Sequence, residues 1–451
     1  MVKKNSIAAM LLLIVAALNA QENQQLSEPE KIFGLSQIWK EASYNYPYFE
    51  DLKKFDWDSI YVAYIEKVIS SESLIEYYTL LTEFISLLED GHTRIIPPQE
   101  YQTFFDEPAI QIMDIEDKAI VTEVGENLAS KIPIGSVIIE VNNIGIDDYM
   151  KKYKYPYISS STDEFKKKIA TLELLRDKKG NEIKIELKTP DGKLISQILT
   201  CESKDNWYKV NKNNNEVLEF NWLKNNIAYV ALNTFNNDKV VHEFEQVLPE
   251  IVKSKGLIID LRKNGGGEDD LGYSILRHII DKPVTTYSWK TREHIAKYKA
   301  QGKWASYIPL DELSDEKRIY LKHFLGDAWF ESVPDTIYPS NGLKVIVPTV
   351  ILIGSFTASA AEDFLVPLTT EGRFIFIGEK TAGFTGTPYI FDLPKGGMAM
   401  INTSREMYQD GKLIRNGMQP DYEIKPTIDD IINDRDIALE KGIDSIQKRI
   451  K

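Results

Sequence analysis

The spacing of apolar residues divides the chain into regions of different predicted secondary structure. Between residues 28 and 88, apolar side chains recur three or four positions apart, which is the spacing of an amphipathic helix. From residue 109 to residue 200, short alternating runs separated by turn residues predict β-strands. From residue 218 onward, continuous apolar runs alternate with helical patterns, which is typical of an α/β core with parallel strands.

These changes of pattern predict a multidomain α/β protein. We place a helical N-terminal domain at residues 27–100, a β-rich domain at 105–202 and an α/β core at 215–440. Within the core, residues 289–335 form an irregular stretch of polar and aromatic residues that we interpret as an insertion. The length of 451 residues agrees with about three ordinary domains.

Residues 1–20 have the layout of a secretory signal peptide. Lys3 and Lys4 precede an apolar run from Ile7 to Ala17, and the small Ala20 comes just before polar residues. A retained membrane anchor is the alternative, but this run is short for a bilayer, and no later stretch reaches ~18 uninterrupted apolar residues. We therefore expect an exported protein, periplasmic or extracellular, with no integral membrane segment after signal removal.

Charge and cysteine content narrow the classes of partner and site. The chain has 54 basic and 68 acidic side chains, for a net charge of −14, and its basic runs are short. Nucleic acid is therefore an unfavourable partner, because binding phosphates needs concentrated positive charge. The single cysteine, Cys201, excludes an intrachain disulfide and a cysteine-rich zinc site.

A glycine-rich loop follows the apolar strand Gly256–Arg262. Three successive glycines, Gly265 to Gly267, allow positive φ angles and bring backbone N–H groups close to a ligand. A phosphate-binding loop is disfavoured, since no Gly-Lys-Ser/Thr follows. Two interpretations stay open: a plain tight turn, or an oxyanion hole in which N–H groups meet a developing negative charge.

Ser359 lies where a second apolar strand, Val350–Ile353, leads through small residues into a predicted helix. The neighbours Ala358 and Ala360 leave its hydroxyl accessible, and the positive end of the helix dipole favours an oxyanion there. The order strand, turn and helix is similar to a nucleophile elbow, although no Gly-x-Ser-x-Gly is present. A simple helix N-cap is the alternative.

His92, in Asp90-Gly91-His92-Thr93, is the candidate base. A single histidine in a sequence is more often a packed or surface residue, so this segment alone does not assign a role. His242 lacks the second histidine of a zinc-protease motif, and we expect no metal site.

Taken in order, these segments resemble the C-terminal-processing (tail-specific) serine peptidases. The resemblance rests on Asp90–Thr93, Asp260–Gly267 and Ser359–Glu362, with Gly378–Gly383 and Gly417–Asp421 similar to later signatures of the family. The closer likeness is to the branch with the tricorn protease core and retinoid-binding-protein-like modules. It covers nearly all of the mature chain.

The resemblance implies a fold and a set of roles. It implies that residues 105–202 are PDZ-like and that the core is a ClpP/crotonase-like peptidase domain. Ser359 would be the nucleophile and His92 its base, and the N–H of Ala360 with one of Gly265 or Gly266 would form the oxyanion hole.

The chain departs from the family pattern at two places. Phe384 stands where the C-terminal-processing branch has its catalytic lysine, and Lys380 matches a different position, so the spacing disfavours a Ser–Lys pair. The glutamate that the tricorn-like branch carries before its Gly-x-x-Pro-Asp motif is replaced here by Asn416. Three candidates for a third catalytic residue stay open: Asn416, Asp90 and Glu362.

The expected function is a secreted serine endopeptidase that acts on polypeptides and needs no cofactor. The PDZ-like region would bind an extended peptide by strand addition. The alternative is a catalytically inactive peptide- or ligand-binding homologue of the same fold. The missing glutamate favours that alternative, whereas Ser359 and His92 argue against it. The sequence indicates neither the oligomeric state nor the particular substrate.

Overall fold

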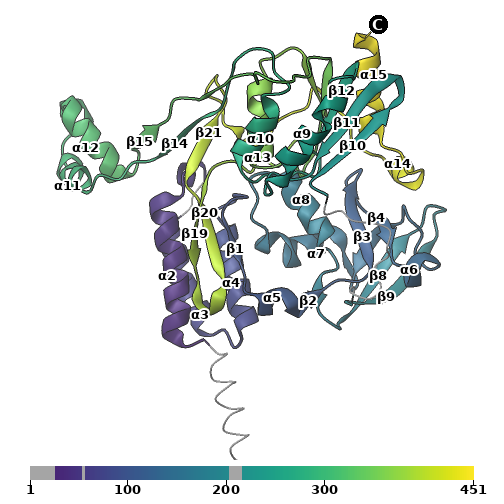
Figure 1. Cartoon of the computed structure of the whole chain (residues 1–451). Coiled ribbons are helices and arrows are strands. Elements are labelled where there is room, and N and C mark those ends of the chain that lie inside the picture. The colour runs from purple at the N-terminus through teal and green to yellow at the C-terminus, as the bar shows by residue number, and fades with distance from the viewer. Residues whose placement is uncertain (1–25, 53–55, 203–215, 451) are drawn as a thin grey trace, which may run out of the picture.

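The computed structural model describes residues 26–52, 56–202 and 216–450 (Figure 1). The predicted signal peptide, residues 1–20, lies outside these ranges. None of the helices in the described ranges combines the length and the apolar character needed to cross a membrane.

The N-terminal region is helical and shares its core with the C-terminal half of the chain. Its helices are α2 (Glu28–Asn45), α3 (Trp57–Ile69) and α4 (Leu74–Ser86), which begin at the side-chain caps Ser27, Asp56 and Ser73. Leu393, Ala399 and Ile401 join their hydrophobic core. The short strand β1 (Arg94–Ile96) pairs antiparallel with β20 (Met398–Asn402), which pairs with β19 (Pro388–Asp392). This pairing carries the segment before β1, with His92, into the C-terminal half.

The middle region is an antiparallel sheet with its own core. The strands are β3 (Ile110–Ile115), β4 (Lys118–Val124), β5 (Val137–Val141), β8 (Glu182–Lys188) and β9 (Leu194–Thr200), hydrogen-bonded in that order. The predicted strands are confirmed here. Three helices lie between them that the strand pattern did not predict: α6 (Glu126–Ala129), α7 (Ile146–Tyr153) and α8 (Asp163–Leu172). Their buried residues, such as Leu128, Met150 and Ala170, belong to the core of this sheet.

The C-terminal region is built on a six-stranded sheet. Its order is β10 (Leu218–Leu223), β11 (Ile227–Leu232), β12 (Gly256–Asp260), β17 (Thr349–Ile353), β18 (Phe374–Gly378) and β22 (Tyr422–Glu423). All neighbours except β10 and β11 are parallel, as the sequence pattern predicts. Asp260 lies opposite Leu352, so the loops after β12 and β17 leave the same edge of the sheet.

Helices cover both faces of this sheet. The helices α9 (Lys239–Ile251), α10 (Asp269–Leu276) and α13 (Ala360–Leu365) contribute to the larger core on one face. Helix α15 (Ile437–Arg449) packs on the other face, where Ala438 and Ile446 share a hydrophobic core with Val350 and Leu352. The strands are therefore buried on both sides, which explains their continuous apolar sequences.

The insertion is more regular than its sequence suggests. Strands β14 (Ser288–Arg292) and β15 (Trp329–Glu331) carry a pair of helices, α11 (Ala296–Ala305) and α12 (Asp315–Leu325), which projects from the molecule (Figure 1). The expectation of an irregular stretch was wrong, because the two helices pack on each other through a small core of Ala305, Leu313 and Leu321. Strand β14 also pairs with β21 (Ser404–Met407).

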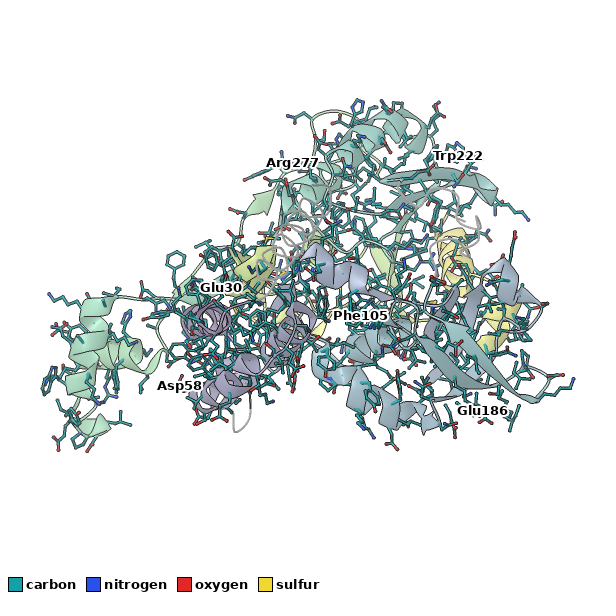
Figure 2. All side chains as sticks on the ribbon, turned by 90° about the horizontal axis from the view of Figure 1, so that it is seen from below. Glu30, Asp58, Phe105, Glu186, Trp222 and Arg277 are labelled. Atoms are coloured by element: carbon teal, nitrogen blue, oxygen red, sulfur yellow. The ribbon has the colours of Figure 1, made fainter. Side chains whose placement is uncertain are left out.

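The remaining elements are short. They are α5 (Gln99–Phe104), β2 (Phe105–Asp106), β6 (Ile144–Gly145), β7 (Asp177–Lys178), β13 (Val284–Thr285), β16 (Thr336–Ile337) and α14 (Ile428–Ile432). In the view from below, the helical region marked by Glu30 and Asp58 and the antiparallel sheet marked by Glu186 lie on opposite sides, with Phe105 between them (Figure 2).

Candidate active site

Ser359 occupies a strained turn between β17 and α13. Its backbone has φ 54° and ψ −130°, a combination that costs a non-glycine residue ~1–3 kcal/mol and is held by its surroundings. The side chain is half-buried, on the wall of a cavity of about 440 Å³. A serine that lines a cavity from a strained strand-to-helix turn has the local geometry of a nucleophile elbow.

The two loops at the edge of the sheet are tied together directly. Thr357 Oγ1 donates to the carbonyl of Leu261 at 2.9 Å, and the N–H of Ala358 donates to the carbonyl of Asn264 at 3.1 Å. Gly266 then packs against the serine turn, where a Cβ on the glycine would lie 2.6 Å from Cβ of Ser359. The glycine loop and the serine turn therefore form one unit.

The structure distinguishes the three predicted oxyanion donors. Ala360 is the first residue of α13, so its N–H has no acceptor inside the helix. The N–H of Gly266 donates to Oδ1 of Asn264 at 2.9 Å, and is engaged in this conformation. Of the two glycines, only Gly266 has its N–H engaged by a side chain in this conformation, and Gly265 stays a prediction for the second donor. The side chain of Asn264 holds this loop, a role that its sequence context does not reveal.

Glu362 anchors the serine turn to the loop after β18. Its buried carboxylate accepts from the N–H of Ser359 at 3.2 Å and from those of Gly383 and Phe384 at 2.9 Å each, and also from Thr381 Oγ1. Burial raises the pKa of Glu362 to about 7, against the lowering effect of these hydrogen bonds. The carboxylate faces these donors, and none of these hydrogen bonds reaches His92.

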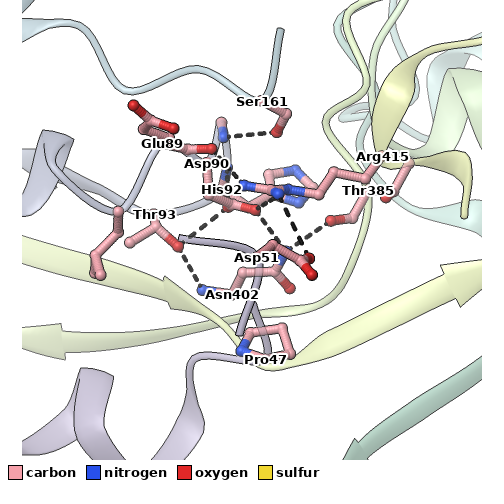
Figure 3. Close-up of polar contacts among 12 residues, drawn as sticks. Pro47, Asp51, Glu89, Asp90, His92, Thr93, Ser161, Thr385, Asn402 and Arg415 are labelled. Atoms are coloured by element: carbon pink, nitrogen blue, oxygen red, sulfur yellow. Dashed lines mark hydrogen bonds and ion pairs between the residues drawn. The ribbon is translucent and has the colours of Figure 1, made fainter. Parts of the chain in front are cut away.

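A tight turn positions His92 ahead of β1 (Figure 3). The carboxylate of Asp90, which is 1 % exposed, accepts from the N–H of His92 at 2.9 Å and from Thr93 Oγ1 at 3.1 Å. Asn402 Nδ2 donates to the second carboxylate oxygen at 3.1 Å, and Arg415 Nε lies 3.6 Å from it. Asp90 thus fixes the backbone of the turn, and its negative charge favours protonation of the ring.

The imidazole of His92 is buried beside the loop after β18, the same loop whose N–H groups donate to Glu362. It packs edge-on against the ring of Phe384, with 6.2 Å between centroids, and lies beside the backbone of Thr385 and Gly386. Burial lowers the pKa of His92 below its ordinary value, which favours the neutral form that a general base needs. Gly386 also lines the cavity that contains Ser359, so one loop borders both side chains.

The third catalytic residue is not identified by contacts in the described part of the chain. Nδ1 of His92 is buried, and no described group hydrogen-bonds to it. The side chain of Asn416 is exposed, and its neighbour Arg415 is the residue that pairs with Asp90. Lys380 pairs with Glu164 at 3.6 Å and lines a different cavity from Ser359.

Within the described ranges, there is no group of three or more histidine, cysteine, aspartate or glutamate side chains that could hold a metal ion.

Comparisons with known proteins give matches over the core and over the whole chain. Residues 226–424 match the model of peptidase family S41. The carboxyl-terminal-processing protease of Picosynechococcus sp. is 22% identical over 423 residues, covering 93% of this chain and 89% of the relative. The chloroplastic carboxyl-terminal-processing peptidase 2 of Arabidopsis thaliana is 22% identical over 405 residues, covering 82% and 67%.

Solved structures share the fold. Mature CPAF complexed with lactacystin superimposes with a TM-score of 0.70 at 15% identity, covering 94% of this chain and 98% of that one. A second structure of mature CPAF gives 0.69 at 15% identity, covering 94% and 97%. The mixed α/β, multidomain architecture is therefore one that known structures contain.

Proposed function

The chain is a peptidase family S41 homologue of the carboxyl-terminal-processing proteases, and from this premise we propose that it is a serine endopeptidase acting through Ser359 and His92. The predicted family and the class of serine-type peptidase are confirmed by the family match and the relatives. The likeness to the tricorn-like branch stays a prediction. The observation that carries the proposal is Ser359 itself, held at φ 54° at the start of α13 and facing a cavity that the loop beside His92 also lines.

The proposed reaction is acyl transfer. Oγ of Ser359 attacks the peptide carbonyl while His92 takes its proton, and His92 then protonates the leaving amine. Water, activated by the same histidine, hydrolyses the acyl-enzyme and regenerates the serine. The N–H groups of Ala360 and Gly265 stabilise the oxyanion, where one donor contributes about 3 kcal/mol in a comparable site.

Three finer assignments belong to the same proposal. The antiparallel sheet of residues 105–202 acts as a PDZ-like module that adds an extended peptide to a strand edge, and its own core supports treatment as a separate unit. The core of residues 215–440 is of the ClpP/crotonase type. The predicted signal peptide supports export to a periplasm or to the outside of the cell.

Labelling with a fluorophosphonate tests the nucleophile. The wild-type protein should label and Ser359→Ala should not. Ser355→Ala is the matched control, because Ser355 lies on the same loop but lines other cavities than Ser359 does. Labelling that persists in Ser359→Ala would place the nucleophile elsewhere.

One observation favours the inactive homologue as the second candidate. Nδ1 of His92 has no partner among the described residues, so no described side chain orients the ring as the third member of a catalytic triad does. Absence of labelling from roughly pH 6 to 9, in a protein with a cooperative thermal transition, would establish that candidate and reject the peptidase.

A further inference from the structure

The cavity beside Ser359 is strongly acidic. Five carboxylate side chains line it, from Glu268, Asp269, Asp270, Asp363 and Glu406, and no lysine, arginine or histidine is among the described residues of its wall. Glu268 and Asp270 are exposed, whereas Asp363 and Glu406 are buried. The acidic groups therefore extend from the exposed part of the wall into its buried part.

The side chains of Asp363 and Glu406 hydrogen-bond to each other, and Glu406 also interacts with the backbone of Gly386, but no cation among the described residues of the wall compensates their burial. Asp363 is 4% exposed and Glu406 is 3% exposed, and Oδ1 of the first and Oε2 of the second have no hydrogen-bond donor among the described residues. Asp269 is better supported, since its Oδ2 accepts from the hydroxyl of Tyr287 at 2.8 Å. A buried ionised carboxylate without a cation is unfavourable, so these groups create a strong demand for positive charge.

The raised pKa values of these carboxyl groups agree with a demand for positive charge in the cavity. Burial, followed by repulsion from Glu406 and Asp269, raises the pKa of Asp363 well above its usual range. Burial and the charge of Asp269 likewise raise the pKa of Glu406. A cation placed among them would reverse this effect and let the carboxylates ionise.

The location of the cavity indicates where the cation comes from. Ser359 lines the same cavity, so a side chain that fills it belongs to a residue next to the carbonyl under attack. A volume of about 440 Å³ accommodates a long side chain rather than a single ion. The described residues also offer no grouping suited to a metal.

We propose that this cavity is the specificity subsite of the enzyme and that it binds the lysine or arginine side chain of a substrate residue flanking the scissile bond. The ammonium or guanidinium group pairs with Asp363 and Glu406. Asp269 is the third carboxylate of the site, and the hydroxyl of Tyr287 holds it in place by a hydrogen bond. The proposal rests on the peptidase function above and adds the class of its substrate.

Matched peptides test the subsite. N-acetylated peptides that differ only in carrying lysine, arginine, norleucine or glutamate at one position exclude any contribution from a terminal amine. We expect kcat/KM for the lysine and arginine peptides to exceed that for norleucine, the neutral isostere, by roughly 10- to 100-fold. Mass spectrometry should locate the cleaved bond beside the basic residue. Equal rates for lysine and norleucine would overturn the proposal.

Variants that remove one negative charge test whether Glu406 and Asp363 form the subsite. Glu406→Gln and Asp363→Asn should lower the lysine-to-norleucine ratio of kcat/KM by roughly 10-fold each. Glu316→Gln, on the distant helix α12, is the matched control and should leave the ratio unchanged. If a variant fails to fold, the wild-type comparison of peptides still decides.

A separate outcome distinguishes failure of the subsite from failure of the proposed function. Fluorophosphonate labelling of Ser359 without a preference for basic peptides would reject the subsite and keep the peptidase. If the protein neither labels nor cleaves, anisotropy with labelled lysine and norleucine peptides on Ser359→Ala tests the cavity alone. Tighter binding of the lysine peptide would support the subsite, and equal binding would reject it.

Discussion

Gly266 and Ser359 are packed so closely that no side chain fits between them. A Cβ on Gly266 would lie 2.6 Å from Cβ of Ser359 and 3.0 Å from the nitrogen of Ala360. Both residues have positive φ angles, 97° for the glycine and 54° for the serine. The glycine loop therefore supports the strained turn that presents the proposed nucleophile, and the two turns are expected to respond together to mutation.

We expect Gly266→Ala to lower the free energy of unfolding by roughly 2 to 4 kcal/mol and to abolish fluorophosphonate labelling. The alanine must adopt the left-handed conformation and displace Ser359. Gly372→Ala is the control, because its Cβ meets no atom within 4 Å. Thermal denaturation and labelling measure the two effects. Normal labelling of Gly266→Ala would show that the loop does not position the serine.

The activity of His92 should depend on pH with a low midpoint. Burial lowers the pKa of the imidazole below its ordinary value of 6.5, and a general base acts in its neutral form. We therefore expect a step in kcat/KM that falls as the pH drops through a midpoint below 6.5, distinct from the titration of Glu362, whose pKa is about 7. A midpoint clearly above 6.5 as the sole acidic step, kept in Glu362→Gln, would contradict the buried geometry of His92.

Histidine variants test whether the pH midpoint of kcat/KM belongs to His92. His92→Ala should lose hydrolysis, whereas His242→Ala should retain the wild-type profile, because His242 is exposed on α9 and contacts Gln246. If instead His92→Ala keeps its activity and Lys380→Ala loses it, a Ser–Lys pair is the correct assignment.

Local motifs were enough to predict the parts of the site that lie on single segments. The strand before Gly265 and the strand–turn–helix around Ser359 were visible in the sequence because apolar runs, glycines and small residues are local features. The acidic cavity was not visible, because Asp269, Asp363 and Glu406 come from segments about 40 to 140 residues apart.

Long-range strand pairing is a second feature that the sequence could not predict. The antiparallel contact of β1 with β20 sets Arg94 opposite Met400, and nothing near either residue in the sequence indicates that partner. Asn264 was overlooked for a different reason. Its role depends on the direction of a side chain, toward Gly266 and the carbonyl of Leu232, which no sequence pattern reveals.

Glu362→Gln should weaken the serine turn. Both carboxylate oxygens accept hydrogen bonds, Oε1 from Gly383 and Oε2 from Ser359 and Phe384. A glutamine must turn its NH₂ group toward one set of these donors, which costs about 1–3 kcal/mol of stability. We expect a lower denaturation midpoint and a lower kcat. Unchanged values for both would show that the turn is held without this anchor.

The choice of third residue follows from comparing Asp90 with Asn416. Asp90 accepts from the N–H of His92 and from Asn402, so Asp90→Asn places an amide donor against existing donors and should reduce both stability, by about 1–3 kcal/mol, and kcat. The side chain of Asn416 is exposed, and Asn416→Gly should keep the wild-type kcat and denaturation midpoint.

Measuring kcat and the denaturation midpoint together distinguishes a residue that orients His92 from one that only holds the structure. A residue that orients His92 affects kcat more than stability, whereas a residue that holds the turn affects both. Because Nδ1 of His92 has no partner among the described residues, an orienter would have to move toward the ring when substrate binds. A fall in kcat for Asn416→Gly at an unchanged denaturation midpoint would identify Asn416 as that residue and leave Asp90 with the turn alone.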